Sequence, residues 1–323
     1  MMQANRTYDG KLTSGTLFSI FLARYMVFGI RFSPGRKPKS IRMNSFLLFL
    51  FSLKVALCTC HTENKRSGFR SGRSHYKVSR IGRLAAVVNE SSGLTYRAGR
   101  NTFWTHNDSG GRPTLYEVAR NGSLVDSLPL PKLKNRDWEA LANQDSTVLF
   151  IGDIGNNSNA RRQLEIYRID PTHPNDFQQI TFHYANQKTF PASKDTRNFD
   201  SEALFATKDS LFLVSKNRSE PQRFVNLYRL PAQAGDYALL PLDSVFLKTM
   251  VTDAALSPDG RTLAVLTYGK IFLFEQQTGR INFQHPTRCL RVPRGQTEGL
   301  TFVNNTDLVM TNERGKMYSI RKK

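Results

Sequence analysis

Beyond residue 80 the chain alternates short apolar runs with short polar segments that carry Gly, Asn and Asp. Runs of about four to eight residues that are rich in β-branched and aromatic side chains are typical of half-buried strands. The dipeptides Asn121-Gly122, Asp259-Gly260 and Thr278-Gly279 favour tight hairpins between such strands. No segment beyond residue 80 shows the period of a long helix, so the pattern predicts an all-β protein.

One short phrase recurs along this part of the chain: an acid, one or two small residues, a leucine and a further apolar stretch. Its copies occupy residues 90–96, 137–142, 200–205, 252–257 and 297–302. The acids of successive copies are 49, 63, 51 and 45 residues apart. Repeats of roughly 40–50 residues with several strands each are typical of propeller blades.

Each copy is followed by a regular series of strand-like runs. Second strands are predicted at 102–105, 148–151, 211–214, 262–266 and 307–310. Third strands are predicted at 115–118, 165–169, 226–230, 271–274 and 317–320. Four units continue into a fourth strand, but the chain ends after the third strand of the last unit, and residues 76–81 would supply the missing one. We therefore predict a β-propeller of five blades closed by an N-terminal strand, with six blades left open by the 63-residue interval.

The repeated acids are expected at one mouth of the central channel, because the connection into each inner strand and the loop after each second strand open on the same face. The acids are Glu90, Glu139, Glu202, Asp253 and Glu298. Two carboxylates about 4 Å apart repel by about 4 kcal/mol at an effective dielectric constant near 20. Such a ring favours a bound cation, and oxygen ligands favour Ca²⁺ or Mg²⁺. Alternatively, each acid simply accepts backbone N–H groups of the neighbouring blade.

Polar loops should meet the acids at the same mouth, bringing in Asn107, Asp108, Asp153, Asn156, Lys216, Asn217, Arg218, Asn312 and Glu313. Convergent polar groups in a pocket are the usual signature of a binding site. The expected ligand contacts are Asn107, Asp108, Asn156, Lys216, Asn217 and Asn312. Glu139, Asp153 and Glu202 are the candidates for a catalytic base.

The formal charge of the 323-residue chain is +20, but most of it lies at the N-terminus. Residues 1–80 hold 15 Lys and Arg against 2 Asp and Glu, whereas the remainder holds 31 against 24. No basic stripe with interleaved aromatic residues stands out in the repeats, so we expect no nucleic-acid partner. Cys289 is the single cysteine after residue 60, which excludes a disulfide within the repeats.

Residues 44–57 form an apolar run of signal-peptide length, preceded by a basic segment. The sequence Leu57-Cys-Thr-Cys60 then resembles a bacterial lipoprotein box, in which Cys60 would carry the lipid. We therefore expect a leader over 1–60, a flexible tether over 61–75 and the propeller over 76–323. A signal peptide cleaved elsewhere is the alternative, and Met26 or Met43 is a candidate for the true start.

Several motifs together resemble the bacterial SdiA-regulated, phytase-like β-propellers. They are Asn107-Asp-Ser-Gly-Gly111, Asp137-Trp-Glu-Ala-Leu141, the run 151–157 with Ile166-Tyr-Arg-Ile169, and Asp200-Ser-Glu-Ala-Leu204. The resemblance covers about residues 84–320 and implies an exported or lipid-anchored protein with an acidic, calcium-binding channel mouth. Calcium phytases resemble six-bladed propellers, so five repeats count against phytase activity.

These observations predict a monomeric protein of the bacterial cell envelope that binds a small-molecule or protein ligand through a divalent cation at the acidic mouth. The sequence leaves open whether the protein is an enzyme. One rival function is the hydrolysis of phosphate or carboxylic esters, with a metal-activated water as the nucleophile. Another is a protein-interaction platform without catalysis. Contact with a membrane is expected only through the lipid anchor.

Overall fold

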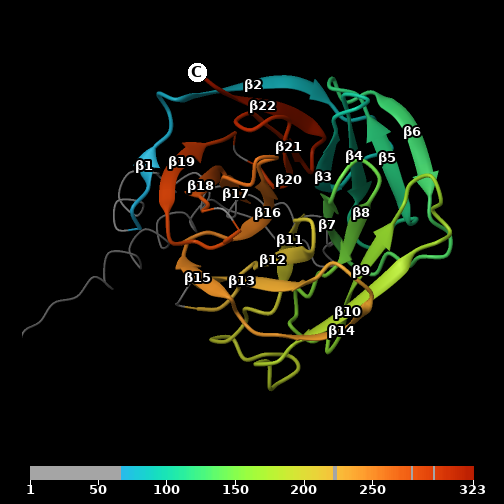
Figure 1. Cartoon of the computed structure of the whole chain (residues 1–323), viewed down its shortest axis with the longest axis vertical. Helices are drawn as coiled ribbons and strands as arrows, with labels where there is room; N and C mark the ends of the chain where they lie inside the picture. The colour runs from blue at the N-terminus through green and yellow to red at the C-terminus, as the bar shows by residue number, and fades with distance from the viewer. Residues whose placement is uncertain (1–66, 221–223, 278, 294) are drawn as a thin grey trace, which may run out of the picture. The chain divides into compact units, whose positions relative to one another are not determined.

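The computed structural model describes residues 67–220, 224–277, 279–293 and 295–323. These residues form β-strands arranged as five sheets around a central axis, and they contain no α-helix (Figure 1). In the described part, accordingly, no helix is long and apolar enough to span a membrane. The expected signal segment, Cys60 and the candidate starts Met26 and Met43 lie outside the described residues.

Five inner strands line the channel, one from each blade. They are β3 (Ser91–Arg97), β7 (Trp138–Asn143), β11 (Ser201–Ala206), β16 (Val251–Leu256) and β20 (Thr297–Phe302). Each inner strand contains most of one copy of the repeated phrase. The five-bladed propeller predicted from the repeats is thus confirmed.

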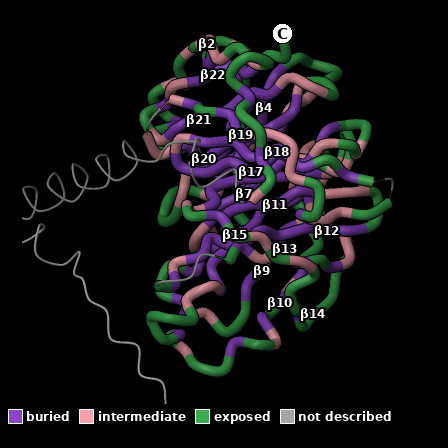
Figure 2. The backbone as a smooth tube through the Cα atoms, turned by 90° about the vertical axis from the view of Figure 1, so that its left-hand side faces the viewer, coloured by how far each residue is buried: buried purple, intermediate pink, exposed green. Residues whose placement is uncertain are grey.

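The middle of each blade consists of two antiparallel strands. The second strands are β4 (Thr102–Asn107), β8 (Leu149–Asp153), β12 (Ser210–Ser215), β17 (Thr262–Thr267) and β21 (Leu308–Asn312). The third strands are β5 (Thr114–Val118), β9 (Leu164–Ile169), β13 (Phe224–Pro231), β18 (Lys270–Glu275) and β22 (Lys316–Lys322). Their apolar side chains pack between blades, so the strands are largely buried while the connections are exposed (Figure 2).

The fourth strands are β6 (Leu124–Pro129), β10 (Gln178–Tyr184), β15 (Asp243–Phe246), β19 (Pro286–Arg291) and β2 (Tyr76–Arg83). β2 pairs antiparallel with β22, from Tyr76 opposite Lys322 to Arg83 opposite Lys316. The N-terminal strand therefore completes the last blade, as the truncated fifth repeat predicted. A strand from one end of the chain thereby holds the other end in the ring.

Two further strands extend the blades and were not predicted. β14 (Gly235–Leu239) leaves its own blade and pairs in parallel with β10 of the preceding one. β1 (Arg70–Ser71) pairs in parallel with β19, and the neighbouring Phe69 is buried against Phe272 and Phe274. The predicted tether over 61–75 therefore needs correction, because its described part, from residue 67 onward, packs on the propeller.

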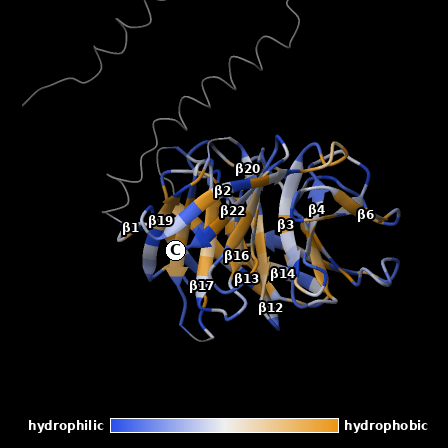
Figure 3. Cartoon of the chain, turned by 90° about the horizontal axis from the view of Figure 1, so that it is seen from above, coloured by the Kyte–Doolittle hydropathy of each residue, from blue (hydrophilic) through white to orange (hydrophobic). Residues whose placement is uncertain are grey.

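The core is divided into five apolar clusters, each lying between two adjacent blades. Figure 3 shows the corresponding pattern, with hydrophobic strands and mostly hydrophilic connections. The 63-residue interval between Glu139 and Glu202 contains no additional blade; its extra residues form a long connection over 185–200. Since each blade buries its faces against two neighbours, the central channel is held rigidly, and side chains at its mouth have fixed positions.

Candidate functional site

A cavity of about 250 Å³ opens at the channel mouth where the inner strands begin. We call it the mouth cavity. Its lining residues are Glu90, Ser91, Ser92, Asp108, Glu139, Asn157, Glu202, Lys216, Arg218, Tyr268, Gln296, Glu298 and Glu313. Six of these side chains are acids and two are cations, so the cavity is a site of concentrated negative charge.

A register shift at the start of every inner strand determines which side chains line the channel. Each shift skips residues on the inner strand, and the first residues skipped are Ser92, Glu139, Glu202, Thr252 and Glu298. A β-bulge re-aims the side chain at the bulged position. Three blades place a glutamate there, whereas the other two place a hydroxyl residue.

Three acids from two neighbouring blades meet on one side of the mouth cavity. Asp108 follows β4, Asp137 precedes β7 and Glu139 occupies the bulge of β7. One carboxylate oxygen of each residue lies within 4.8 Å of one from each of the others. Oxygen atoms that ligate a common Ca²⁺ ion lie at comparable separations, since each Ca–O distance is about 2.3–2.6 Å.

The surrounding backbone fixes the positions of these acids. Asn135 donates a hydrogen bond from Nδ2 to the carbonyl of Asp108 at 2.9 Å and accepts one from the N–H of Trp138 at 3.1 Å, which ties the two loops together. Asp137 lies against Gly155, where an added Cβ would stand 2.3 Å from the Asp137 carboxyl carbon. Gly155 is thus required for the close approach of that carboxylate.

The opposite side of the mouth cavity contains a network of ion pairs. Lys216 contacts Glu202 through Nζ and Oε2. Arg218 donates from Nε to Asp200 Oδ2 at 2.6 Å and from Nη2 to Glu202 Oε1 at 3.2 Å. Arg218 also binds the side-chain oxygen of Asn157. The two cations of the cavity are therefore engaged by Asp200 and Glu202, and the remaining acids of the cavity form no ion pair among the described residues.

The last blade contributes Glu298, in β20, and Glu313, which follows β21. Gln296 donates from Nε2 to Glu313 Oε1 at 2.5 Å. Tyr268 closes this side, with the Lys216 ammonium 5.3 Å from its ring centroid. Glu298 is buried at the bulge position of β20.

Burial and mutual repulsion raise the pKa values of several acids at the channel mouth. Burial, together with the charges of Asp108 and Asp200, raises the pKa of Asp137 to about 6. Burial and the charge of Asp108 raise the pKa of Glu313 to about 7. Burial raises the pKa of Glu202 to about 7, although Lys216 and Arg218 act in the opposite direction. Burial and the charge of Glu202 raise the pKa of Glu139 well above its usual value.

For Glu298, burial and the charge of Glu202 likewise raise the pKa well above its usual value. For Lys216, burial lowers the pKa, but the charges of Glu202, Tyr268 and Glu298 outweigh it and leave the pKa well above normal. A mouth without a bound cation therefore retains protons near neutral pH. A divalent cation would compete with those protons for the same oxygens.

Of the five predicted metal ligands, four line the mouth cavity, namely Glu90, Glu139, Glu202 and Glu298. Asp253 does not. It follows the bulged Thr252, and its two oxygens accept the N–H groups of Ala254 at 2.8 Å and Leu300 at 2.6 Å. Asp253 thus accepts backbone N–H groups, including one of the neighbouring blade, as the alternative interpretation of the repeated acids predicted.

Of the six predicted ligand contacts, only Asp108 and Lys216 line the mouth cavity. The four asparagines shape loops instead: Asn107 donates to Val87 O, Asn156 to Phe199 O and Asn217 to Phe224 O, and Asn312 accepts from Lys316 N. The candidate base Asp153 also lies outside the cavity. It is fully buried and forms an ion pair with Arg161 at 2.9 Å. Glu139 and Glu202 remain the candidate bases inside it.

Sequence reasoning missed Asp137, Asn157, Tyr268 and Gln296 as individual lining or ligating residues. The sequence did contain a signal for Asp137. It lies two positions before Glu139, just as Asp200 lies two positions before Glu202. Gln296 occupies the same place before Glu298. No sequence signal distinguishes Tyr268 from the core aromatic residues.

Comparison of the chain with models of known protein families gives one match. A family model described as SdiA-regulated matches residues 72–268. No curated protein matches the chain. Among solved structures, a gluconolactonase from Xanthomonas campestris has 14% identity and a TM-score of 0.44, with 77% of this chain and 90% of that chain covered.

Two further structures are similarly distant. The WD40 domain of Pan2 from Neurospora crassa has 10% identity and a TM-score of 0.43, with 75% of this chain and 94% of that chain covered. A PQQ-bound aldose sugar dehydrogenase from Streptomyces coelicolor has 10% identity and a TM-score of 0.47, with 77% and 98% covered. At TM-scores below 0.5, these resemblances carry no argument about activity.

Proposed function

The chain belongs to the SdiA-regulated family, and from this membership and the charge of its channel mouth we propose that the protein binds a ligand through a divalent cation in the mouth cavity. The observation that carries the proposal is the close group of Asp108, Asp137 and Glu139, whose ligand atoms all lie within 4.8 Å of one another. All three donors are carboxylate oxygens, which are the ligand atoms that Ca²⁺ and Mg²⁺ prefer. Zinc sites use mainly nitrogen and sulfur ligands instead.

The residues present fit such a cation. Among the described residues, no lysine or arginine forms an ion pair with these three carboxylates, although the charge of Arg161 acts to lower the pKa of Asp137 and that of Lys216 acts to lower the pKa of Glu139. The cation would be held by these three residues, and the rest of the cavity would contact the ligand. Arg218 and Lys216 would face the negatively charged part of a ligand, while Glu298 and Glu313 would accept its hydroxyl or ammonium donors.

A second candidate function is the hydrolysis of phosphate or carboxylic esters in the same cavity. A bound divalent cation polarises a carbonyl or phosphoryl oxygen. The observation that favours this function is that Glu202 and Glu313 each have a pKa of about 7 beside the three acids. A group with a pKa near the working pH serves well as a general acid or base. Of the candidate bases Glu139 and Glu202, Glu202 would hold or transfer the proton, because Glu139 would hold the cation.

The first test is metal analysis of the purified protein, followed by calorimetric titration of the metal-free form with Ca²⁺ and Mg²⁺. Binding of about one ion that is lost in Asp137→Asn supports the cation site, whereas absence of binding refutes it. A panel of phosphate and carboxylic esters, assayed with and without chelator, then separates the two functions. Turnover that chelator abolishes and Glu202→Gln lowers favours the hydrolase; cation binding without turnover favours the ligand-binding protein.

We also propose that the protein acts as a monomer in the bacterial cell envelope, attached by a lipid on Cys60. The support is the lipoprotein-like sequence Leu57-Cys-Thr-Cys60 after an apolar run. Two or more acyl chains anchor a protein stably, whereas one holds it weakly.

A further inference from the structure

The mouth cavity contains a buried carboxylate that lacks a partner. Glu298 is 7% exposed and lines the cavity. Among the described residues, no ion pair and no hydrogen bond to its carboxylate is found. The charge of Lys216 acts on Glu298, but the Lys216 ammonium contacts Glu202 instead. A buried carboxylate without a donor or a cation is energetically costly, so Glu298 is a group that a ligand can satisfy.

The packing around β20 keeps this carboxylate at the cavity. Glu298 occupies the bulge of β20 between Thr297 and Gly299. Thr297 Oγ1 donates to Thr267 O in the preceding blade at 3.2 Å. An added Cβ at Gly299 would stand 2.9 Å from Leu94 Cβ in the first blade. Since the backbone on both sides is held by neighbouring blades, Glu298 cannot turn out to solvent without disturbing the ring.

Further acids surround Glu298 with negative charge. The charges of Glu202, Glu313 and Asp108 act to raise its pKa. The charges of Asp108 and Glu90 act in the same way on the pKa of Glu313. An anionic group placed beside Glu298 would therefore be repelled from several directions, whereas a cationic group would be attracted.

The cations of the cavity do not offset this charge. Lys216 and Arg218 are the two cations of the lining, and both form ion pairs with acids at the start of β11. The exposed Arg314 acts on Glu313 from outside the lining and forms no ion pair among the described residues. The charge of the proposed divalent cation would be balanced by its own three carboxylates.

The cavity suits a small hydrophilic ligand. Its volume of about 250 Å³ is below the usual range of about 300–1,000 Å³ for ligand pockets. No lining residue is aliphatic, and Tyr268 is the one aromatic residue of the lining. A second metal ion does not suit Glu298. In the described part of the chain, the acids close enough to ligate an ion together are those of the proposed cation site, and Glu298 is not among them.

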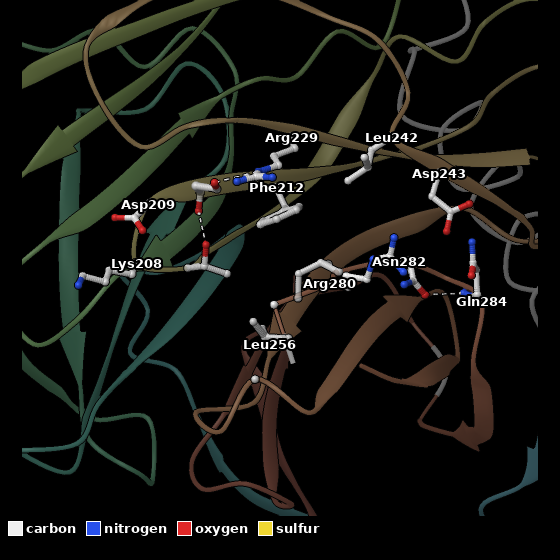
Figure 4. Close-up of a pocket in the computed structure, with 15 residues that line it drawn as sticks. Lys208, Asp209, Phe212, Arg229, Leu242, Asp243, Leu256, Arg280, Asn282 and Gln284 are labelled. Atoms are coloured by element: carbon white, nitrogen blue, oxygen red, sulfur yellow. Dashed lines mark hydrogen bonds between the residues drawn. The ribbon is translucent and has the colours of Figure 1, made fainter. Parts of the chain in front are cut away.

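A larger cavity, of about 620 Å³, lies between the third and fourth blades (Figure 4). Its lining contains charged side chains of both signs, namely Lys208, Asp209, Arg229, Asp243 and Arg280. All five are exposed or partly exposed, so solvent can satisfy them. This cavity therefore presents no buried charge that requires a ligand, in contrast to the mouth cavity.

We infer that the mouth cavity selects a ligand with a primary ammonium group, which donates to Glu298 while oxygen atoms of the same ligand approach the proposed cation. An ammonium group carries three N–H donors and a positive charge, and so supplies both things that Glu298 lacks. Hydrogen bonds between charged groups are roughly twice as strong as neutral ones, which favours an amine over a hydroxyl. The ligand class is thus the small amino alcohols and amino sugars. This inference rests on the proposed function, because the ligand lies beside the cation.

The test uses three probes built on one polyol chain: the amine glucamine, neutral sorbitol and anionic sorbitol phosphate. Affinities are measured by calorimetry on the whole protein, loaded with Ca²⁺ and freed of excess ion. Glucamine should bind about tenfold more tightly than sorbitol, and sorbitol phosphate should bind most weakly. Glu298→Gln keeps the volume of the side chain and removes its charge. Its affinity for glucamine should therefore fall about tenfold, to that of sorbitol.

The matched control is Glu275→Gln, which should bind glucamine as the wild type does. Glu275 is exposed at the end of β18 that lies away from Tyr268 and the mouth. Thermal unfolding checks that both variants fold. A wild-type protein that binds no Ca²⁺ would overturn the proposed function and, with it, this inference. If Ca²⁺ binds but glucamine does not bind more tightly than sorbitol, or if Glu298→Gln keeps the preference, the inference alone is overturned.

Discussion

Asp253 in β16 accepts a hydrogen bond of 2.6 Å from the backbone N–H of Leu300 in β20, and so joins the inner strands of two adjacent blades. Its other oxygen accepts the N–H of Ala254 at 2.8 Å. The carboxylate that the repeat suggested as a metal ligand therefore holds the ring together. Its neighbour Thr252 occupies the bulge position from which Glu139, Glu202 and Glu298 reach the mouth in their own blades.

Asp253→Ala should destabilise the protein without affecting cation binding. The substitution leaves two buried N–H groups without acceptors, which costs about 1–3 kcal/mol. We expect the midpoint of thermal unfolding to fall by several degrees while the calorimetric response to Ca²⁺ is unchanged. Asp126→Ala, at an exposed carboxylate of β6, is the control and should have little effect. A variant that unfolds normally but no longer binds the cation would contradict this structural role.

Chelator should lower the thermal stability of the wild-type protein. A cation present at about one hundred times its dissociation constant stabilises the folded state by about 2.7 kcal/mol. For a domain of this size that corresponds to a shift of about 5–10 °C. Asp108→Asn and Glu139→Gln should fold and should lose the response to chelator and to added Ca²⁺, whereas Asp170→Asn at an exposed site should keep it. An identical chelator response in all three variants would exclude the three-acid site.

The stability of the cation-free protein should fall as the pH rises from about 5 to about 8. The folded pKa values of Asp137, about 6, and of Glu313, about 7, are raised above the ordinary values of 3.8 and 4.5. A raised folded pKa contributes stability that is fully present below the ordinary value and is lost as the pH rises through the folded pKa.

Urea unfolding in chelator across this window measures the effect, and Glu313→Gln should flatten the dependence. Added Ca²⁺ should restore stability mainly at the alkaline end, where it no longer competes with protons. If the cation-free protein became more stable across this window, the mouth acids would not be the groups that control it.

Deleting Tyr76–Arg83 should lower the unfolding midpoint by several degrees or cause aggregation. The deletion removes the partner of β22 and exposes the edge of the last blade, including the side of the cluster on which Tyr76 and Val78 pack. Unpaired strand edges promote association between chains. Thermal melts and size-exclusion chromatography report both effects. A deletion variant that stays monomeric with the wild-type midpoint would show that this strand is dispensable.

Cys60→Ser should move the protein from the membrane fraction to the soluble fraction of a bacterial host. Cys58→Ser is the matched control, because it changes a cysteine two residues away and should leave the protein attached. Fractionation followed by immunodetection, together with the mass of the mature N-terminus, measures the outcome. A wild-type protein that is soluble and uncleaved would refute lipid anchoring at this residue.

Much of the architecture could be predicted from the sequence alone. Five copies of one phrase, each followed by strand-like runs, specify five blades, because a blade can bury its faces only against similar neighbours. The missing last strand specified closure by residues 76–81, which β2 supplies. The repeat also placed the acids at one mouth, and Glu139, Glu202 and Glu298 line its cavity.

Only the tertiary structure decided which acid of each phrase faces the channel. A shift of one residue moves a side chain to the other face of a strand, and the bulge in each inner strand sets that shift. In β16 the bulge directs Asp253 toward the backbone of Leu300. Asp137 instead lies in the connection before β7, where its carboxylate approaches that of Glu139. The crossing of β14 to another blade likewise has no local sequence signal, because the pairing of strands depends on which edges the folded ring leaves free.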